Sequence, residues 1–333
     1  MESNYVDSCD VSVVIVNWNA CDLLRDCLKS IFDQTRQIDF EVIVVDNSSS
    51  DASVAMVRDE FPQVKLIAEE VNLGFARANN VGIIQSRGRY VLLLNPDTVI
   101  LDDAIGRSLN WIVSHPDVAV LGCQVFENET TIQKTCFAHP TLFNLFLDLA
   151  GMTSRFGNST FLGRSVLGGW DRQTERDVPV VSGMFMLIPR KAIDEVGLMD
   201  EQFFVYSEEA DLCRRFWSAG WRCVFSPVAK IIHRDGGGKS TSQTSVKMYV
   251  QMQKSNQLYI YKHYGIAGWL IGKVIYIIAM GFRVMVHASR CCFTKSVGAR
   301  HQLRQSLEAL KFHFLGDNSN GNQNVKAHRL EKK

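Results

Sequence analysis

The chain of 333 residues is long for a single domain and short for three. Its residues are 46% hydrophobic and 21% charged, a composition that excludes a disordered or fibrous protein. The 36 basic and 35 acidic residues nearly balance, but from Lys262 onward 12 Lys or Arg stand against 3 Asp or Glu. This basic C-terminal part favours an anionic partner, either membrane lipid or nucleic acid.

The nine cysteines form no CxxC pair and are odd in number, which is typical of reduced thiols in the cytosol. Residues 1–10 are polar and lack the apolar core of a signal peptide. We therefore expect the body of the chain to be cytoplasmic.

The first hundred residues alternate between strand and helix patterns. Apolar strands are expected at 11–16, 41–45, 64–67 and 91–94, with helices between them, the last starting near residue 75. Strands separated in this way by helices predict a parallel sheet with right-handed crossovers.

Polar residues follow all four strands, where a parallel sheet would bring them to one edge. Ligands of open α/β sheets bind at this edge, so a polar crevice is expected there. The residues are Asn17, Asn19, Asp46, Asn47, Asn72, Asn95 and Asp97.

Asp97 follows Pro96, which must end the buried strand because proline cannot donate to a sheet. Two interpretations are open. Asp97 holds a divalent metal against a nucleotide diphosphate, or it caps the helix that follows.

Two common nucleotide-binding motifs are absent. No glycine lies between Val11 and Gln34, which excludes a dinucleotide G-x-G-x-x-G motif after the first strand. Residues 238–240 match the end of a P-loop, but His233 occupies its first glycine position, so 236–240 are interpreted as a mobile loop.

The next part of the chain has a helix after residue 102, a strand at 118–121, and an irregular segment at 126–178. The glycines and aromatic residues of that segment indicate an acceptor-binding region or an ordinary packed loop. A β-like run at 180–187 and a helix from Pro189 to Val196 follow, with proline in the first turn.

A cluster of acids then follows an aromatic strand expected at 203–205. Ser207 is placed as an N-cap, and Glu208, Glu209 and Asp211 occupy the first helical turn. The helix dipole favours acids there. Alternatively, one of them is a general base whose pKa is raised by its neighbours. Short strands are expected at 221–225 and 230–233, and His233 is either structural or a second metal ligand beside Asp97.

Long helices are expected from 242 to 289. The apolar run at 274–282 is about 13.5 Å long, which is too short for a simple membrane-spanning helix. Basic residues gather on one helical side, which favours an amphipathic helix in an anionic membrane interface. The alternative is a helix packed on the body, and residues 317–333 are expected to be disordered.

Together these motifs resemble family 2 glycosyltransferases of the GT-A fold, in their rhamnosyltransferase-like branch. The resemblance covers about residues 11–238 and departs from the general family pattern at two motifs. Asn95-Pro96-Asp97 stands in place of the family's DxD motif, and Glu208-Glu209 replaces its Glu-Asp base motif. The matching segments are 13–19, 44–51, 72–80, 95–97, 182–183, 204–213 and His233.

The resemblance implies an α/β GT-A fold, with a mostly parallel Rossmann-like sheet flanked by helices. Residues 1–238 would form the glycosyltransferase domain, divided into a nucleotide-binding half (about 1–125) and an acceptor and catalytic half (126–238). Residues 239–316 would form a helical, basic, membrane-associated extension.

The implied activity is a metal-dependent, inverting transfer of rhamnose or another hexose. The donor would be a dTDP- or UDP-linked sugar, and the acceptor a glycan or lipid-linked glycan at the inner face of the cell membrane. Asp97, with His233, would hold Mg²⁺ or Mn²⁺, and the base would be Glu209 or Glu208, with Asp211 less favoured. Residues expected to bind the donor are Asn17, Asn19, Asp46, Asn47, Asn72, Gly74, Asn79 and Asn95.

Two other functions are open to this sequence. A GT-A domain can bind nucleotide sugar without turnover and act as an assembly partner. Nucleic-acid binding through the basic tail is disfavoured, because no base-stacking aromatics are interleaved with its basic residues.

Overall fold

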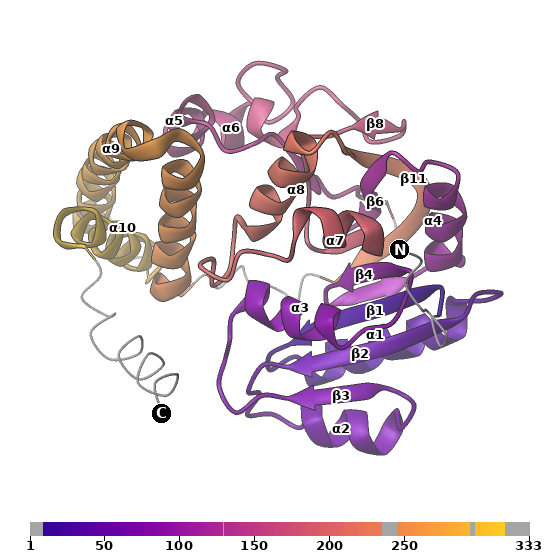
Figure 1. Cartoon of the computed structure of the whole chain (residues 1–333). Helices are drawn as coiled ribbons and strands as arrows, with labels where there is room; N and C mark the ends of the chain where they lie inside the picture. Colours follow the sequence, from indigo (N-terminus) through magenta and orange to yellow (C-terminus); the bar gives the residue numbers. More distant parts are fainter. Residues whose placement is uncertain (1–8, 129, 235–244, 294–296, 317–333) are drawn as a thin grey trace, which may run out of the picture. The chain divides into compact units, whose positions relative to one another are not determined.

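The computed structural model describes residues 9–128, 130–234, 245–293 and 297–316 (Figure 1). The chain forms two compact units. The first contains Met1–Pro140 and Gly151–Gln243, and the second contains Thr141–Ala150 and Thr244–Lys333. The contacts therefore group the short segment Thr141–Ala150 with the C-terminal helices.

The first unit is built on a nine-stranded sheet with the order β3-β2-β1-β4-β10-β6-β11-β5, and β8 pairs with β11. The predicted parallel part is present, because β1 pairs in parallel with β2 and β4, and β2 with β3 (Figure 1). These strands are β1 (Val11–Asn17), β2 (Phe40–Asp46), β3 (Lys65–Ala68) and β4 (Tyr90–Leu94).

Helices cover the central parallel strands β1, β2 and β4 on both faces, which explains their largely apolar sequences. On one face, Val13 and Ile15 of β1 share a core with Leu28 of α1. On the other, Val16 and Val45 pack with α3. The helices are α1 (Cys21–Gln34), α2 (Ser53–Glu60) and α3 (Phe75–Ile84).

The second half of the sheet is mixed. β10 is antiparallel to β4 and β6, whereas β11 is parallel to β6 and antiparallel to β5. Its elements are β5 (Thr98–Ile100), α4 (Ala104–Val113), β6 (Val118–Phe126), β8 (Arg176–Asp177), β10 (Phe185–Pro189), α7 (Arg190–Val196), α8 (Glu208–Ser218) and β11 (Arg222–His233). The segment predicted to be irregular contains β7 (Cys136–Phe137), α6 (Met152–Arg155), the 3-10 helix η1 (Arg164–Val166) and, after it, β9 (Val180–Val181).

Three local predictions were wrong. β11 is one strand and not two, because the irregularity between Phe225 and Lys230 shifts its register without ending it. Residues 204–205 form a bend and residue 203 has no regular structure, so no strand lies at 203–205. Pro189 precedes the first turn of α7 as its N-cap residue and also ends β10.

The second unit consists of α5 (Leu142–Leu149), α9 (Val246–Phe293) and α10 (Val297–Leu315). Gly265, at φ 67° and ψ −169°, interrupts α9. Asn256 bonds to Tyr276 and Arg283 bonds to Tyr249, so the two halves of α9 pack as an antiparallel hairpin. Arg283 also donates to the Leu149 carbonyl, which attaches α5 to this hairpin.

α9 is long and apolar enough to cross a membrane, judged by length and composition alone. The apolar run at 274–282 is too short for this by itself, whereas an 18-residue window of the whole helix reaches a mean hydropathy of 1.7. Ile271, Val274, Ile278 and Phe282 are all more than half exposed. The predicted loop at 236–240 and the predicted disordered tail lie outside the described residues.

Candidate active site

Asp97 lies just past the carboxyl end of β4, in the turn between β4 and β5. The next element is a strand, and the N-cap residue of α4 is Asp103, so the helix-cap interpretation of Asp97 was wrong. The turn is held by the Thr98 hydroxyl, which donates to the Asn95 carbonyl at 2.8 Å, and by the Asn95 amide, which donates to the Met184 carbonyl at 3.2 Å. Beneath it lies the Cys27 thiol, whose pKa burial raises to about 12.

Strand pairing brings His233 beside Asp97. His233 is opposite Thr98 in the antiparallel β11–β5 pair, and the Arg234 amide donates to the Asp97 carbonyl at 2.8 Å. The Nε2 atom of His233 lies 3.1 Å from Oδ1 of Asp97, and both residues are 7% exposed. This Oδ1 atom is buried and has no hydrogen-bond partner, because the close contact lacks hydrogen-bond geometry.

Gln133 orients the imidazole and was missed by sequence reasoning. Its Oε1 atom lies 3.1 Å from Nδ1 of His233. With Nδ1–H donating to this oxygen, Nε2 keeps its lone pair on the side of Asp97. Gln133 is 100 residues away in sequence and in an irregular segment, so no local pattern pointed to it.

The donor set, one carboxylate oxygen and one imidazole nitrogen, can hold a divalent cation. Two ligand atoms at right angles around an octahedral ion, each about 2.1 Å from it, are about 3 Å apart. The separation of Nε2 and Oδ1 matches this value. No group of three or more His, Cys, Asp or Glu forms a metal site in the described part of the chain. Two protein ligands leave positions for phosphate oxygens and water, as Mg²⁺ sites commonly do.

The ends of β1 and β2 are joined by hydrogen bonds. Asn17 Nδ2 donates to Asp46 at 2.9 Å, and the Ser49 amide donates to the other Asp46 oxygen at 2.9 Å. Asn19 accepts from Ser50 at 2.7 Å. Asn17 Oδ1 is buried without a partner and can accept a hydrogen bond from a ligand.

Trp18 stands between Asn17 and Asn19 and is 56% exposed. An exposed indole at the carboxyl edge of a sheet offers a flat apolar face beside hydrogen-bonding groups. Sequence reasoning gave Trp18 no role, because a single tryptophan at a strand end has no distinct pattern.

Asn47 acts as a clamp on the loop before α3. Its Nδ2 donates to Asn72 Oδ1 at 3.0 Å and to the Gly74 carbonyl at 3.1 Å, and its Oδ1 accepts from the Leu73 amide at 2.7 Å. The Asn47 side chain is 3% exposed and its polar atoms are engaged, so it positions this loop. Asn79 is also buried, and it donates to the Phe75 carbonyl within α3.

The clamped loop reaches the acidic helix through Phe204. The Phe75 amide donates to the Phe204 carbonyl at 2.6 Å, and a Cβ atom on Gly74 would lie 2.3 Å from the same oxygen. Gly74 has φ 82° and ψ 179°, a region that only glycine occupies readily. The loop before α3 thus contacts the segment that leads to the acids.

Gly74→Ala is expected to destabilise the protein by more than backbone strain alone, which is about 1–3 kcal/mol. The added methyl group would meet the Phe204 carbonyl. Gly197→Ala is the matched control, because Gly197 has φ 90° and ψ 173° and no atom lies within 4 Å of the place its methyl group would take. Denaturant unfolding of both variants measures the difference, and equal losses would contradict a role for the Phe204 contact.

The acids begin α8 after an unusual turn. Tyr206 and Ser207 both have positive φ, at 72° and 69°, which is rare for a tyrosine and marks a constrained site. Ser207 is the N-cap residue, but its side chain makes no capping hydrogen bond. The acids therefore follow a constrained turn, and the side chain of the N-cap residue does not cap the helix.

Glu208 is 3% exposed and Glu209 is half-buried, and Oε2 of each is buried without a hydrogen-bond partner. Burial and the neighbouring Glu209 carboxylate raise the pKa of Glu208 well above the ordinary 4.5. Burial also raises the pKa of Glu209. Asp211 differs, because it is fully buried and pairs with Arg215 Nε at 2.9 Å.

Comparison with known proteins identifies the family. Residues 12–197 match the sequence model of Glycosyl transferase family 2. Over 244 residues the chain is 27% identical to N-acetylglucosaminyl-diphospho-decaprenol L-rhamnosyltransferase of Mycobacterium tuberculosis, covering 68% of this chain and 76% of that protein. It is 23% identical over 242 residues to the uncharacterized protein y4gI of Sinorhizobium fredii, covering 71% of this chain and only 26% of that protein.

Solved structures share the fold. A mannosyltransferase from Pyrobaculum calidifontis, in complex with GDP-Man and Mn²⁺, aligns with a TM-score of 0.55 at 14% identity, covering 95% of this chain and 89% of that one. GalNAc-T7 with UDP, GalNAc and Mn²⁺ aligns with a TM-score of 0.53 at 16% identity, covering 68% and 43%. The predicted GT-A fold and family are confirmed, and the chain belongs to glycosyl transferase family 2.

Proposed function

We propose that the protein is a metal-dependent, inverting glycosyltransferase of glycan biosynthesis. The observation that carries this proposal is the buried, unpartnered Oδ1 of Asp97 beside Nε2 of His233. These two residues would hold Mg²⁺ or Mn²⁺. When bound, the ion would neutralise negative charge on the leaving diphosphate.

Glu209 is proposed as the general base. Its side chain is partly exposed, whereas Glu208 is only 3% exposed, so of the two acids Glu209 is the better placed to meet an acceptor hydroxyl. Burial and the Glu209 carboxylate raise the pKa of Glu208, and burial raises the pKa of Glu209, which suits Glu209 to accept a proton. The pairing of Asp211 with Arg215 favours a structural role for that acid.

In the reaction, Glu209 takes the proton of an acceptor hydroxyl as its oxygen attacks C1 of the donor sugar. The new C1–O bond forms on the face opposite the diphosphate. The old C1–O bond breaks, and the diphosphate leaves with its electron pair. A single displacement inverts the anomeric centre.

For the donor we propose a dTDP- or UDP-linked sugar, rhamnose or another hexose. The hydrogen-bonded pair Asn17–Asp46 lies next to the exposed Trp18 in the chain. These groups suit a nucleotide base, whose edges form hydrogen bonds and whose flat ring can stack on an indole. Asn19, Asn47, Asn72, Gly74, Asn79 and Asn95 shape or support this edge.

For the acceptor we propose a glycan or lipid-linked glycan at the inner face of the cell membrane. The name of the rhamnosyltransferase relative includes a diphospho-decaprenol-linked acceptor. The exposed apolar residues of α9, together with the basic C-terminal part, suit an anionic membrane surface.

Thermal unfolding with a panel of nucleotide sugars tests this function. One donor is expected to stabilise the protein through ligand linkage, and more strongly with Mn²⁺ than with a chelator. Transfer to an acceptor, followed by mass spectrometry, separates an enzyme from a nucleotide-sugar-binding assembly partner. Donor binding without transfer to any acceptor would support the binding partner.

A further inference from the structure

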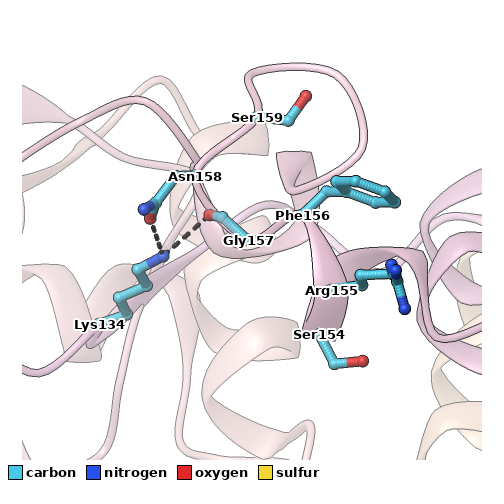
Figure 2. Close-up of a pocket in the computed structure, with 7 residues that line it drawn as sticks. All are labelled: Lys134, Ser154, Arg155, Phe156, Gly157, Asn158 and Ser159. Atoms are coloured by element: carbon cyan, nitrogen blue, oxygen red, sulfur yellow. Dashed lines mark hydrogen bonds between the residues drawn. The ribbon is translucent and has the colours of Figure 1, made fainter.

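A hollow of about 460 Å³ lies in the first unit, beside the loop that follows α6 (Figure 2). Lys134 forms one side of it, and residues 154–159 form the other. Gln133, the residue before Lys134, contacts His233 of the candidate metal site. The hollow and the candidate metal site are therefore lined by neighbouring residues of the chain.

Three side chains that line this hollow keep unused donor protons. Lys134 Nζ uses two of its three protons, on the Gly157 carbonyl at 2.8 Å and on Asn158 Oδ1 at 2.9 Å. Because Oδ1 accepts from Lys134, the amide NH₂ of Asn158 remains a donor (Figure 2). Ser159 Oγ accepts from two backbone amides, which leaves its hydroxyl proton to donate.

The charge of the hollow is positive. Its lining contains Lys134 and Arg155 and no carboxylate. Arg155 contacts the Phe156 ring, with 5.9 Å between guanidinium carbon and ring centre, and has no ion-pair partner among the described residues. A further cation, Arg172, does not line the hollow; it is 2% exposed, donates to backbone carbonyls, and leaves its Nε without a hydrogen-bond partner.

The positive charge of Arg172 acts on Lys134. Burial and the neighbouring Arg172 both lower the pKa of Lys134. Like charges held together without a carboxylate favour an anion that accepts several hydrogen bonds.

We propose that this hollow binds a phosphate or diphosphate group of the acceptor. The proposal deepens the proposed function and rests on it, because it assigns an anionic, phosphate-linked class of acceptor to the transferase. Lys134 and Arg155 supply charge, and Asn158 and Ser159 supply neutral donors. The Phe156 ring, which is 43% exposed, offers an apolar surface beside them.

The kinetic test uses two soluble acceptors with the same sugar and alkyl chain, one joined by a diphosphate and one without phosphate. Arg155→Gln and Lys134→Met are each expected to raise KM for the diphosphate acceptor about tenfold, a loss of about 1.4 kcal/mol. KM for the phosphate-free acceptor and for the donor should not change. Lys191→Met is the control, because Lys191 lies outside the hollow and contacts the Trp221 ring. Equal changes for both acceptors would overturn the proposal.

A binding test separates this proposal from the proposed function. Calorimetry with inorganic pyrophosphate in the presence of a chelator removes binding that depends on a metal ion. The wild type is expected to bind, and Arg155→Gln and Lys134→Met to bind about tenfold more weakly, with Lys134→Arg restoring affinity. This readout holds even if no transfer is found. Unchanged binding in both charge-removing variants would overturn the proposal.

Discussion

Glu209→Gln is expected to slow sugar transfer about 10²–10⁴-fold, the usual contribution of a positioned general base. Glutamine keeps the size of the side chain but cannot accept the proton of the attacking hydroxyl. Donor binding should be unchanged, because no donor-binding residue is altered. Single-turnover transfer measures the chemical step, and nucleotide-sugar titration measures binding.

Glu208→Gln is the matched control. Glu208 is only 3% exposed whereas Glu209 is partly exposed, so Glu208 is not expected to meet the acceptor hydroxyl, and transfer should fall far less than in Glu209→Gln. A large loss in Glu208→Gln with activity retained in Glu209→Gln would reverse the assignment of the two residues. Asp211→Asn should instead lower stability, since it leaves the partly buried Arg215 guanidinium without its carboxylate.

The pH dependence of transfer follows from the raised pKa of Glu209. Its carboxylate, the form that acts as base, increases as pH rises through that pKa. The rate should therefore rise on the alkaline side of the ordinary value of 4.5 and reach a plateau above the raised pKa. Glu209→Gln should abolish this rise, and a rate that is flat from acid to neutral pH would contradict the assignment.

The contribution of Glu208 to the free energy of unfolding should fall as pH rises, whereas the transfer rate should rise. The folded state keeps a proton that the unfolded chain releases, so this contribution is complete below 4.5 and is lost as pH rises through the raised pKa. Glu208→Gln should stabilise the protein at about pH 8 and have little effect at about pH 4, which denaturant unfolding at the two pH values can measure.

The sequence predicted the parallel part of the fold because local patterns encode it. Strands β1, β2 and β4 are largely apolar, and polar residues mark their carboxyl ends. The antiparallel strands β10 and β5 were not placed, because their partners are set by long-range contacts. The break assumed within β11 was a register shift, which has no distinct sequence signal.

Sequence analysis named the main residues of the candidate site but not the contacts between them. Asp97, His233 and the two glutamates were named from strand ends and the helix start. Gln133 was missed because it acts across 100 residues, and the clamping contacts of Asn47 were hidden among the Asx residues common in turns. Hydrogen-bond partners decide these roles, and they depend on tertiary structure.

Asp97→Asn is expected to remove metal-dependent donor binding and to lower transfer by at least about 10²-fold, because a metal supplies several kcal/mol of charge stabilisation. The substitution keeps the shape of the side chain but removes the negative charge that a hard cation requires. Asp26→Asn is the matched control, because Asp26 contacts Arg234, the neighbour of His233, and is far more exposed. Mn²⁺ titration followed by electron paramagnetic resonance, with and without nucleotide sugar, measures the loss directly.

Gln133→Leu tests the same site through the ring nitrogen of His233 that does not face Asp97. Removing the Oε1 acceptor frees the His233 ring to rotate or to change tautomer, without touching Asp97. Loss of such a supporting contact typically weakens metal affinity about 10–100-fold. Mn²⁺ affinity in Gln133→Leu should therefore lie between that of the wild type and that of Asp97→Asn. If both variants bound Mn²⁺ and donor as the wild type does, the 3.1 Å contact between Asp97 and His233 would be structural.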